Sequence, residues 1–201
     1  SDITEYDALI WITSNATDDV LNAIEISAIS TYLDQGGKML LTGENIGEFA
    51  GTEDLLATYF KAQHEEDNLG QSYVMLVGEP NGPFPDAEII IAGGGAGTTE
   101  AQSSITPLGE ATSLFEYLIL ENIGGVGYNG DTYSTVYLAF NVEAVSGIND
   151  SWRGADVIWN CMHWMDATTS VDEPTAEAVL PTAVELSGYP NPFNAAMTVS
   201  Y

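Results

Sequence analysis

Two short apolar segments, separated by a stretch with helical spacing and a Gly–Gly pair, constrain the fold of this chain most strongly. Residues 6–13 and 38–42 are rich in β-forming side chains, which is typical of strands buried on both faces. Between them, apolar residues recur at helical spacing after a cap expected at Thr17 or Asp18, and residues 36–37 end the helix. This strand–helix–strand unit predicts a parallel sheet covered by helices on both faces.

The rest of the chain extends this pattern less regularly. A second helix is expected over residues 52–60 and a last helix over residues 152–167. Further strands are expected where apolar and β-branched residues cluster, at residues 73–77, 87–92, 114–120 and 135–140. The glycine-rich residues 93–97 and 124–130 favour a loop and a turn. The chain is therefore expected to be an α/β protein.

The C-terminal part differs in composition from the rest. Residues 168–185 are rich in Thr, Pro and Glu, which is typical of a linker. We expect an α/β domain over residues 1–167, this linker, and a short segment over residues 186–201 that ends in an extended strand. Because the sequence opens with Ser1 and has no 18-residue apolar run, we expect a processed chain or a fragment that does not insert into a membrane.

Basic residues are nearly absent. The 30 Asp and Glu residues face only three Lys and Arg residues, and the formal net charge is -27. A field of this sign repels nucleic acid and anionic lipid, so neither is an expected partner, whereas a cationic partner or a salty setting is compatible with it. Few sites exist for proteases that cut after Lys or Arg, which suits a protein outside the cell. The lone Cys161 excludes a disulfide framework within the chain and a Cys-rich zinc site.

Catalytic motifs are weak. Cys161 stands among Trp and Met residues on the expected last helix and is interpreted as a core residue. His64 and His163 form no H-E-x-x-H pattern, and no G-x-S-x-G elbow exists. Residues 93–97 lack the Lys-Ser/Thr of a phosphate-binding loop. The residues therefore favour a protein that is not an enzyme and has no bound cofactor.

Acidic and amide side chains leave one cofactor open, because calcium takes several oxygen ligands. The alternative interpretation is a solvated acidic surface. Sequons of the N-x-S/T type begin at Asn15 and Asn149, and they leave glycosylation undecided. The carboxylates considered as calcium ligands are Glu65, Glu66, Asp67, Asp131 and Asp150.

Four motifs resemble a known family when they are taken in order: YDALIW (6–11), YLDQGG (32–37), LTGENI (41–46) and VYLAFNVEA (136–144). They resemble a class I glutamine-amidotransferase-like domain of secreted bacterial proteins. The resemblance implies a flavodoxin-like three-layer sandwich with a mostly parallel central sheet. A β-α-β unit precedes the first motif in that family, so here the sheet is expected to lack its first β-α-β unit and to have an open edge.

The same resemblance bears on activity. Active members place a Cys nucleophile on the sharp turn after the strand. In this chain that turn is Gly43, Glu44 and Asn45, so a carboxylate stands where the Cys would be. A carboxylate does not form the thioester of this chemistry, and the resemblance therefore implies a degenerate site without catalysis.

The C-terminal segment carries a second resemblance. It is similar to the start of the C-terminal sorting domain of type IX secretion, which implies a secreted or cell-surface protein. That domain continues for several more strands in its family, so the signal here would be truncated. The residues that carry the resemblance are Tyr189, Pro190, Asn191, Pro192, Phe193 and Asn194.

These observations favour a non-catalytic structural or adhesive module that self-assembles into filaments by strand donation. The expected partner is a further copy of the chain or the missing N-terminal part of its own precursor. The alternatives are a hydrolase or amidotransferase-like enzyme with a displaced active site that uses Glu44, and an accessory binding domain of a secreted peptidase. The strand expected to be donated consists of Met197, Thr198, Val199, Ser200 and Tyr201.

Overall fold

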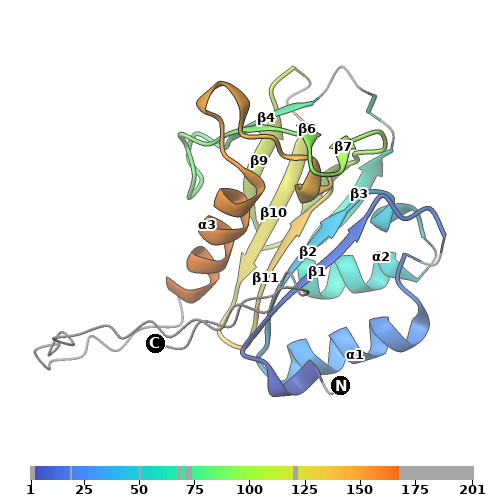
Figure 1. Ribbon diagram of the computed structural model, residues 1–201. Coiled ribbons are helices and arrows are strands. Elements are labelled where there is room, and N and C mark those ends of the chain that lie inside the picture. Colours follow the sequence, from blue (N-terminus) through green and yellow to red (C-terminus); the bar gives the residue numbers. More distant parts are fainter. Residues whose placement is uncertain are drawn as a thin grey trace, which may run out of the picture. The chain divides into compact units, whose positions relative to one another are not determined.

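The computed structural model describes residues 3–167 except 19, 50, 68, 71–73, 120 and 121. Its centre is a nine-stranded sheet with the order β1–β2–β11–β10–β9–β4–β5, and β8 and β3 continue from β10 beside this path (Figure 1). The strands of the sheet are β1 (Ala8–Ser14), β2 (Lys38–Gly43), β3 (Ala62–Glu66), β4 (Met75–Gly78), β5 (Glu88–Ile90), β8 (Ser104–Pro107), β9 (Thr112–Tyr117), β10 (Ile123–Asn129) and β11 (Ser134–Leu138).

The helices and a small hairpin complete the described part. The hairpin consists of β6 (Ala92–Gly94) and β7 (Gly97–Thr98). The longer helices are α1 (Ala23–Asp34), α2 (Thr52–Leu55), which continues as the π-helical turn η3 (Leu56–Phe60), and α3 (Gly154–Ala167). The short helical turns are η1 (Ile3–Glu5), η2 (Ile46–Glu48), η4 (Val142–Ala144) and η5 (Ile148–Asp150). None of the helices in the described residues has the length and apolar character of a membrane span.

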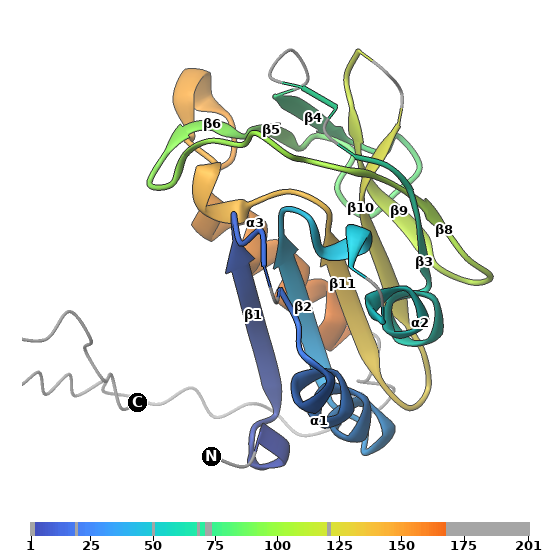
Figure 2. The ribbon, with the colours of Figure 1, turned by 90° about the vertical axis from the view of Figure 1, so that its right-hand side faces the viewer.

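Only one part of the sheet is parallel. β2 pairs in parallel with β1 and with β11, whereas the other strand pairs among the described residues are antiparallel. The sheet curls along its antiparallel part into a half-barrel (Figure 2). The expected flavodoxin-like three-layer sandwich with a mostly parallel sheet is therefore wrong. The fold is a curled mixed sheet in which β1 forms one end.

The clearest departure from expectation is β10, where glycine content predicts a turn. Gly124 and Gly127 are instead strand positions packed against large side chains. A Cβ atom at Gly124 would lie 2.6 Å from the Leu76 side chain, and one at Gly127 would lie 2.5 Å from the Trp164 ring. Glycine lets these neighbours approach the backbone. Because β10 then lies between β9 and β11, it makes this half of the sheet antiparallel.

Helix α1 begins at a capping box that was not predicted from the sequence. The Asn22 side chain accepts hydrogen bonds from the backbone N–H groups of Ile24 and Glu25, at 2.9 and 3.1 Å. The Glu25 carboxylate in turn accepts the backbone N–H of Asn22 at 2.9 Å. This reciprocal pair satisfies donors that a helix start leaves free. The cap expected at Thr17 or Asp18 is therefore wrong, and the helix starts more than one turn later.

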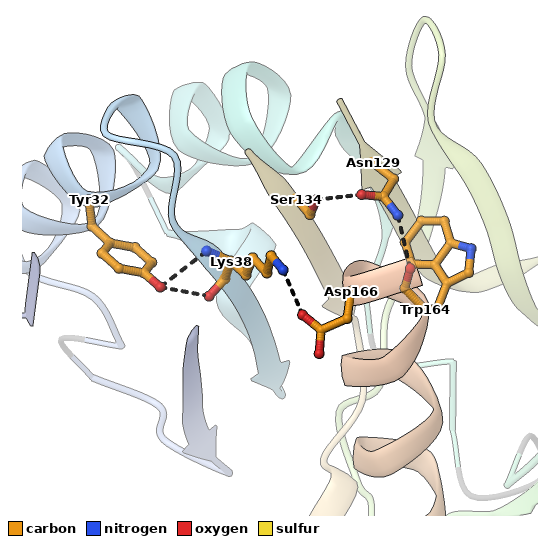
Figure 3. Close-up of polar contacts among 6 residues, drawn as sticks. All are labelled: Tyr32, Lys38, Asn129, Ser134, Trp164 and Asp166. Carbon is orange, nitrogen blue, oxygen red and sulfur yellow. Dashed lines mark hydrogen bonds and ion pairs between the residues drawn. The ribbon is translucent and has the colours of Figure 1, made fainter. Parts of the chain in front are cut away.

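The end of α1 is joined to the start of β2 by one tyrosine. The Tyr32 hydroxyl donates to the carbonyl of Lys38 at 3.0 Å and accepts the N–H of the same residue at 3.1 Å (Figure 3). Gly37 packs directly beneath the Tyr32 ring, where a Cβ atom would collide with it. Gly36 has φ +95°, a left-handed conformation that favours glycine. The Gly–Gly pair thus ends the helix, as predicted.

Helices cover the parallel strands on both faces (Figure 1). Leu40 of β2 belongs to a buried cluster that includes Val157 and Cys161 of α3. Its neighbour Leu41 belongs to a second buried cluster with Leu33 of α1. Successive residues of a strand point to opposite faces, so one buried strand contributes to both cores.

Two polar contacts hold the end of α3 to the sheet, and a third orients the Asn129 side chain that makes one of them (Figure 3). The Lys38 ammonium lies 2.6 Å from the Asp166 carboxylate. The Asn129 amide donates to the carbonyl of Trp164 at 3.0 Å, and its oxygen accepts a short hydrogen bond from the Ser134 hydroxyl. These contacts join the last turn of the helix to β2 and to the β10–β11 hairpin.

Candidate functional site

A cavity of about 700 Å³ lies at the carboxyl ends of the parallel strands. The β6–β7 hairpin lies beyond the arrowheads of β1 and β2 in both ribbon views (Figures 1 and 2). Its Ala96 N–H donates to the carbonyl of Glu143 at 3.1 Å, which fixes the hairpin to η4. The residues that line the cavity are Asn15, Thr17, Glu44, Asn45, Ala96, Gly97, Thr98, Glu100, Ala101 and Asn141.

The floor of this cavity includes the turn that follows β2. Gly43 packs against the Thr13 side chain, where a Cβ atom would collide. Asn45 has φ +61°, and Ser14, at the end of the neighbouring β1, has φ +56°. Left-handed conformations of this kind are uncommon outside glycine and often occur at functional sites. The sharp turn at Gly43, Glu44 and Asn45 thus lies beside the cavity, but it carries no Cys.

The Glu44 residue is only 3% exposed. It accepts the backbone N–H of Ala101 at 3.0 Å and that of Glu100 at 3.3 Å, one on each oxygen. Burial raises the pKa of Glu44 above its ordinary range, the two backbone N–H groups oppose this shift, and the charge of Glu100 adds to it. The carboxylate therefore holds the 100–101 segment against the turn after β2.

The histidines and the cysteine lie elsewhere. His64 is on β3, and its Nε2 makes a short ion pair with Asp67. The Nδ1 atom of His163 lies 3.0 Å from the Trp159 carbonyl within α3. Cys161 is fully buried in the core, as predicted, and burial raises the pKa of its thiol well above the ordinary range. None of these side chains lines the cavity.

The acids considered for calcium do not form a common site. Glu65 and Glu66 are exposed on β3, a strand that was not predicted because its sequence is acidic. Asp67 pairs with His64, while the exposed Asp131 and Asp150 belong to the β10–β11 turn and to η5. Among the described residues, no three His, Cys, Asp or Glu side chains gather as metal ligands. Calcium binding stays an untested prediction.

The C-terminal predictions lie outside the described residues. This applies to the linker and to the segment over residues 186–201. The residues concerned are Tyr189, Pro190, Asn191, Pro192, Phe193 and Asn194 of the sorting-like motif and Met197, Thr198, Val199, Ser200 and Tyr201 of the expected strand.

A second feature with functional potential is the free edge of β1. This strand pairs with β2 on one side, and no other described strand pairs with its opposite side. Ile10 is in register with Leu40 and therefore points to the α3 face of the sheet, as does Ile12. Both are exposed, at 45% and 40%, whereas Leu9 and Trp11 pack against the core on the other face. The edge thus combines unpaired backbone groups with apolar side chains.

Comparison with known proteins gives structural neighbours only. No protein-family model and no curated protein matches the chain. An IFT52 N-terminal domain aligns with a TM-score of 0.55 and 13% identity, covering 86% of this chain and 83% of that one. The cytoplasmic protein STM3548 from Salmonella typhimurium aligns with a TM-score of 0.55 and 13% identity, covering 81% and 72%. The β-galactosidase from Rahnella sp. R3 aligns with a TM-score of 0.54 and 14% identity, covering 94% of this chain but 26% of the enzyme.

These neighbours correct the family resemblance. At such low identity they show the fold alone, and they include an IFT52 domain and a cytoplasmic protein. Together with the mixed half-barrel sheet, they overturn the identification as a flavodoxin-like, class I glutamine-amidotransferase-like domain followed by a type IX sorting signal. The physical reason is that the quoted motifs, such as residues 6–11 and 41–46, follow the apolar strands and turns that many β-α-β units share.

Most residues of the cavity were not predicted from the sequence. Asn15, Asn45 and Asn141 each follow one of the three parallel strands closely, and Glu100 comes from a distant loop. A signal existed for the asparagines, because the carboxyl ends of parallel strands meet at one edge of a sheet. Glu100 had no comparable signal, since its position depends on the path of the β6–β7 hairpin.

Proposed function

We propose that the chain is a non-catalytic structural module that acts outside the cell and joins copies by strand donation. In this proposal, residues 197–201 of one copy add a strand beside β1 of the next. The observation that carries it is the free β1 edge with the exposed Ile10 and Ile12. An unpaired edge with apolar side chains is a template for a strand from another chain.

The sequence of the proposed donor fits this edge. In an extended strand, Met197, Val199 and Tyr201 would fall on one side, and the hydroxyl-bearing residues between them on the other. The apolar side would cover Ile10 and Ile12. The intervening residues 168–196 span up to roughly 100 Å when extended, so their length allows a link to a neighbouring copy.

The charge of the chain determines how such assembly must work. Copies with a net charge of -27 repel one another. Backbone hydrogen bonds and apolar contacts must therefore supply the attraction, and added salt should strengthen it by screening the repulsion. The small number of Lys and Arg residues also supports a location outside the cell, because it leaves few sites for proteases of that specificity.

The proposal treats the protein as non-catalytic for two reasons. Both oxygens of the Glu44 carboxylate already accept backbone hydrogen bonds. The thiol of Cys161 is buried in the core. Neither group is placed as a nucleophile, and a hydrolase or amidotransferase-like activity is therefore the weaker alternative.

Sedimentation velocity of the full chain tests the proposal. The full chain should form oligomers that grow with protein and salt concentration, and a chain that lacks residues 197–201 should be monomeric. The double variant Ile10→Gln/Ile12→Gln should also be monomeric, whereas Ile24→Gln should assemble normally because it alters an 82% exposed isoleucine on α1. A full chain that stays monomeric at all concentrations, or a truncated chain that still assembles, contradicts strand donation.

A further inference from the structure

The cavity beside Glu44 lies where two chain segments diverge. After β2 the chain runs to α2, whose Leu55 packs in the same cluster as α1. After β11 it runs through η4 to α3 on the opposite face (Figures 1 and 2). Where the segments after two neighbouring parallel strands run to opposite faces of the sheet, a crevice forms at the carboxyl ends of the strands. Ligands of α/β proteins bind in such crevices. Its volume of about 700 Å³ falls within the usual range for small-molecule sites.

The charge of the lining selects a cation. Glu44 and Glu100 bring two carboxylates, and no Lys, Arg or His side chain is among the described residues that line the cavity. The basic residues of the chain have other contacts: Lys38 pairs with Asp166 and Arg153 with Asp156, while the Lys61 ammonium lies 5.5 Å from the centre of the Tyr128 ring. The field inside the cavity therefore attracts positive charge and repels phosphate and carboxylate groups.

The remaining lining selects an organic ligand with hydroxyl groups. The side chains of Asn15, Thr17 and Thr98 supply amide and hydroxyl groups that both donate and accept hydrogen bonds. The Asn141 amide is instead used within the protein, where its oxygen accepts the Glu143 N–H at 2.9 Å and its nitrogen donates to the Ser14 hydroxyl at 3.3 Å. The described residues do not gather three carboxylate, imidazole or thiolate ligands around one point, which disfavours a bare metal ion.

One wall of the cavity is backbone rather than side chain. Gly97 has φ +84° and lines the cavity with open space where a Cβ atom would stand. Gly94, in the same hairpin, packs closely against Ala144. A Cβ atom at Gly94 would lie 2.5 Å from the carbonyl carbon of Ala144. The hairpin is therefore a supported wall, and a ligand can approach its backbone closely.

We propose that this cavity binds a small amino sugar, with its primary ammonium group on the carboxylates of Glu44 and Glu100 and its hydroxyl groups on Asn15, Thr17 and Thr98. Each carboxylate oxygen of Glu44 keeps a second lone pair beside the backbone N–H that it accepts, so it can accept the ammonium as well. This site goes beyond the proposed assembly through β1, because none of the residues that line it belongs to β1.

Calorimetric titration of the full chain with glucosamine tests the proposal, with glucose and N-acetylglucosamine as neutral comparisons. Glucosamine should bind saturably, and the neutral sugars should bind about tenfold more weakly or less, because they lack the charge-assisted hydrogen bonds. Glu100→Gln should weaken glucosamine binding about tenfold, since it removes one carboxylate at an exposed position without an expected effect on folding.

Glu5→Gln is the matched control, because it removes the same charge from the exposed η1 turn at the other end of β1. It should leave the affinity for glucosamine unchanged. Equal weakening by Glu5→Gln and Glu100→Gln would mean diffuse attraction to an acidic surface and would overturn the proposal. Equal affinity for glucosamine and glucose, or the absence of saturable binding, would overturn it as well.

Discussion

The Glu44 carboxylate accepts the backbone N–H of Ala101 at 3.0 Å, and this contact joins the turn after β2 to the segment before β8. The Glu44 side chain is nearly buried, and no basic side chain is among the described residues that line the cavity beside it. Backbone N–H groups take the role of the missing cation. In a chain with three basic residues, carboxylates must find such partners or face solvent.

Replacing Glu44 by alanine should destabilise the protein by about 2 kcal/mol at pH 7. The substitution leaves the backbone N–H groups of Glu100 and Ala101 without their acceptor inside a mostly buried site. Urea unfolding followed by circular dichroism measures the change. Glu44→Gln keeps one acceptor oxygen and should therefore lose less stability than Glu44→Ala. An unchanged stability of Glu44→Ala would contradict the structural role of this carboxylate.

Stability should fall as the pH rises from about 5 to 7. Burial is the main cause that raises the pKa of Glu44, Glu48 and Glu79 above their ordinary value of 4.5. A carboxyl group with a raised pKa in the folded state binds its proton more tightly there than in the unfolded state. Its contribution to the free energy of unfolding is therefore present at low pH and is lost as the pH rises through the raised pKa. Arg153 lowers the pKa of Asp156 to about 2, so that carboxylate stays ionised throughout this window.

Thermal melts between pH 4.5 and 7.5 check this dependence. The melting temperature should be higher near pH 5 than at pH 7, which is the reverse of proteins whose carboxylates have basic partners. Glu44→Gln should flatten the curve, whereas Glu110→Gln, at an exposed position, should leave its slope unchanged. A melting temperature that rises steadily toward pH 7 would show that the buried carboxyls do not govern stability.

Asn129→Ala should cost more stability than Lys38→Met. The Asn129 side chain connects the Ser134 hydroxyl with the Trp164 carbonyl, and its loss leaves both without this partner, at a cost of about 1–2 kcal/mol. Lys38 pairs with the Asp166 carboxylate, which is 65% exposed, and such pairs contribute less than about 1 kcal/mol. Urea unfolding at low and high salt distinguishes the two variants, because only the loss of stability in Lys38→Met should become smaller as salt is added.

Gly127→Ala should destabilise the protein by about 1–3 kcal/mol, because the new methyl group would press against the Trp164 ring. Gly95→Ala is the control, since its nearest neighbour would be the Glu143 carbonyl at an ordinary 3.7 Å. Its stability should change by no more than about 0.5 kcal/mol. Denaturant unfolding of both variants checks the difference, and equal effects would argue against the close packing of β10.

The glycines of β10 also explain why the sequence predicted only part of the fold. The segments that form β1, β2 and β11 are short apolar runs and that of α3 has helical spacing, and the structure confirms these elements within a few residues. Gly124 and Gly127 resemble turn residues in the sequence because the side chains that fill their space come from other segments. The antiparallel half of the sheet was therefore hidden, and with it the fold class.

The cavity shows the same limit. The turn at Gly43, Glu44 and Asn45 could be located because it follows an apolar strand directly. The approach of Glu100 depends on the path of the β6–β7 hairpin, and this path is set by tertiary contacts such as the hydrogen bond from Ala96 to Glu143. Local patterns do not carry that information.

Salt should raise the thermal stability, because 30 acidic residues with few basic partners repel one another and screening reduces this repulsion. Melting temperatures in sodium chloride provide the baseline, and calcium chloride at matched ionic strength tests for a specific site. If acids such as Asp131 or Asp150 bind calcium, the melting temperature should rise above the sodium baseline at submillimolar calcium, and Asp131→Asn or Asp150→Asn should abolish the extra rise. Identical curves in both salts would contradict calcium binding, while a melting temperature that is insensitive to either salt would contradict the role of repulsion.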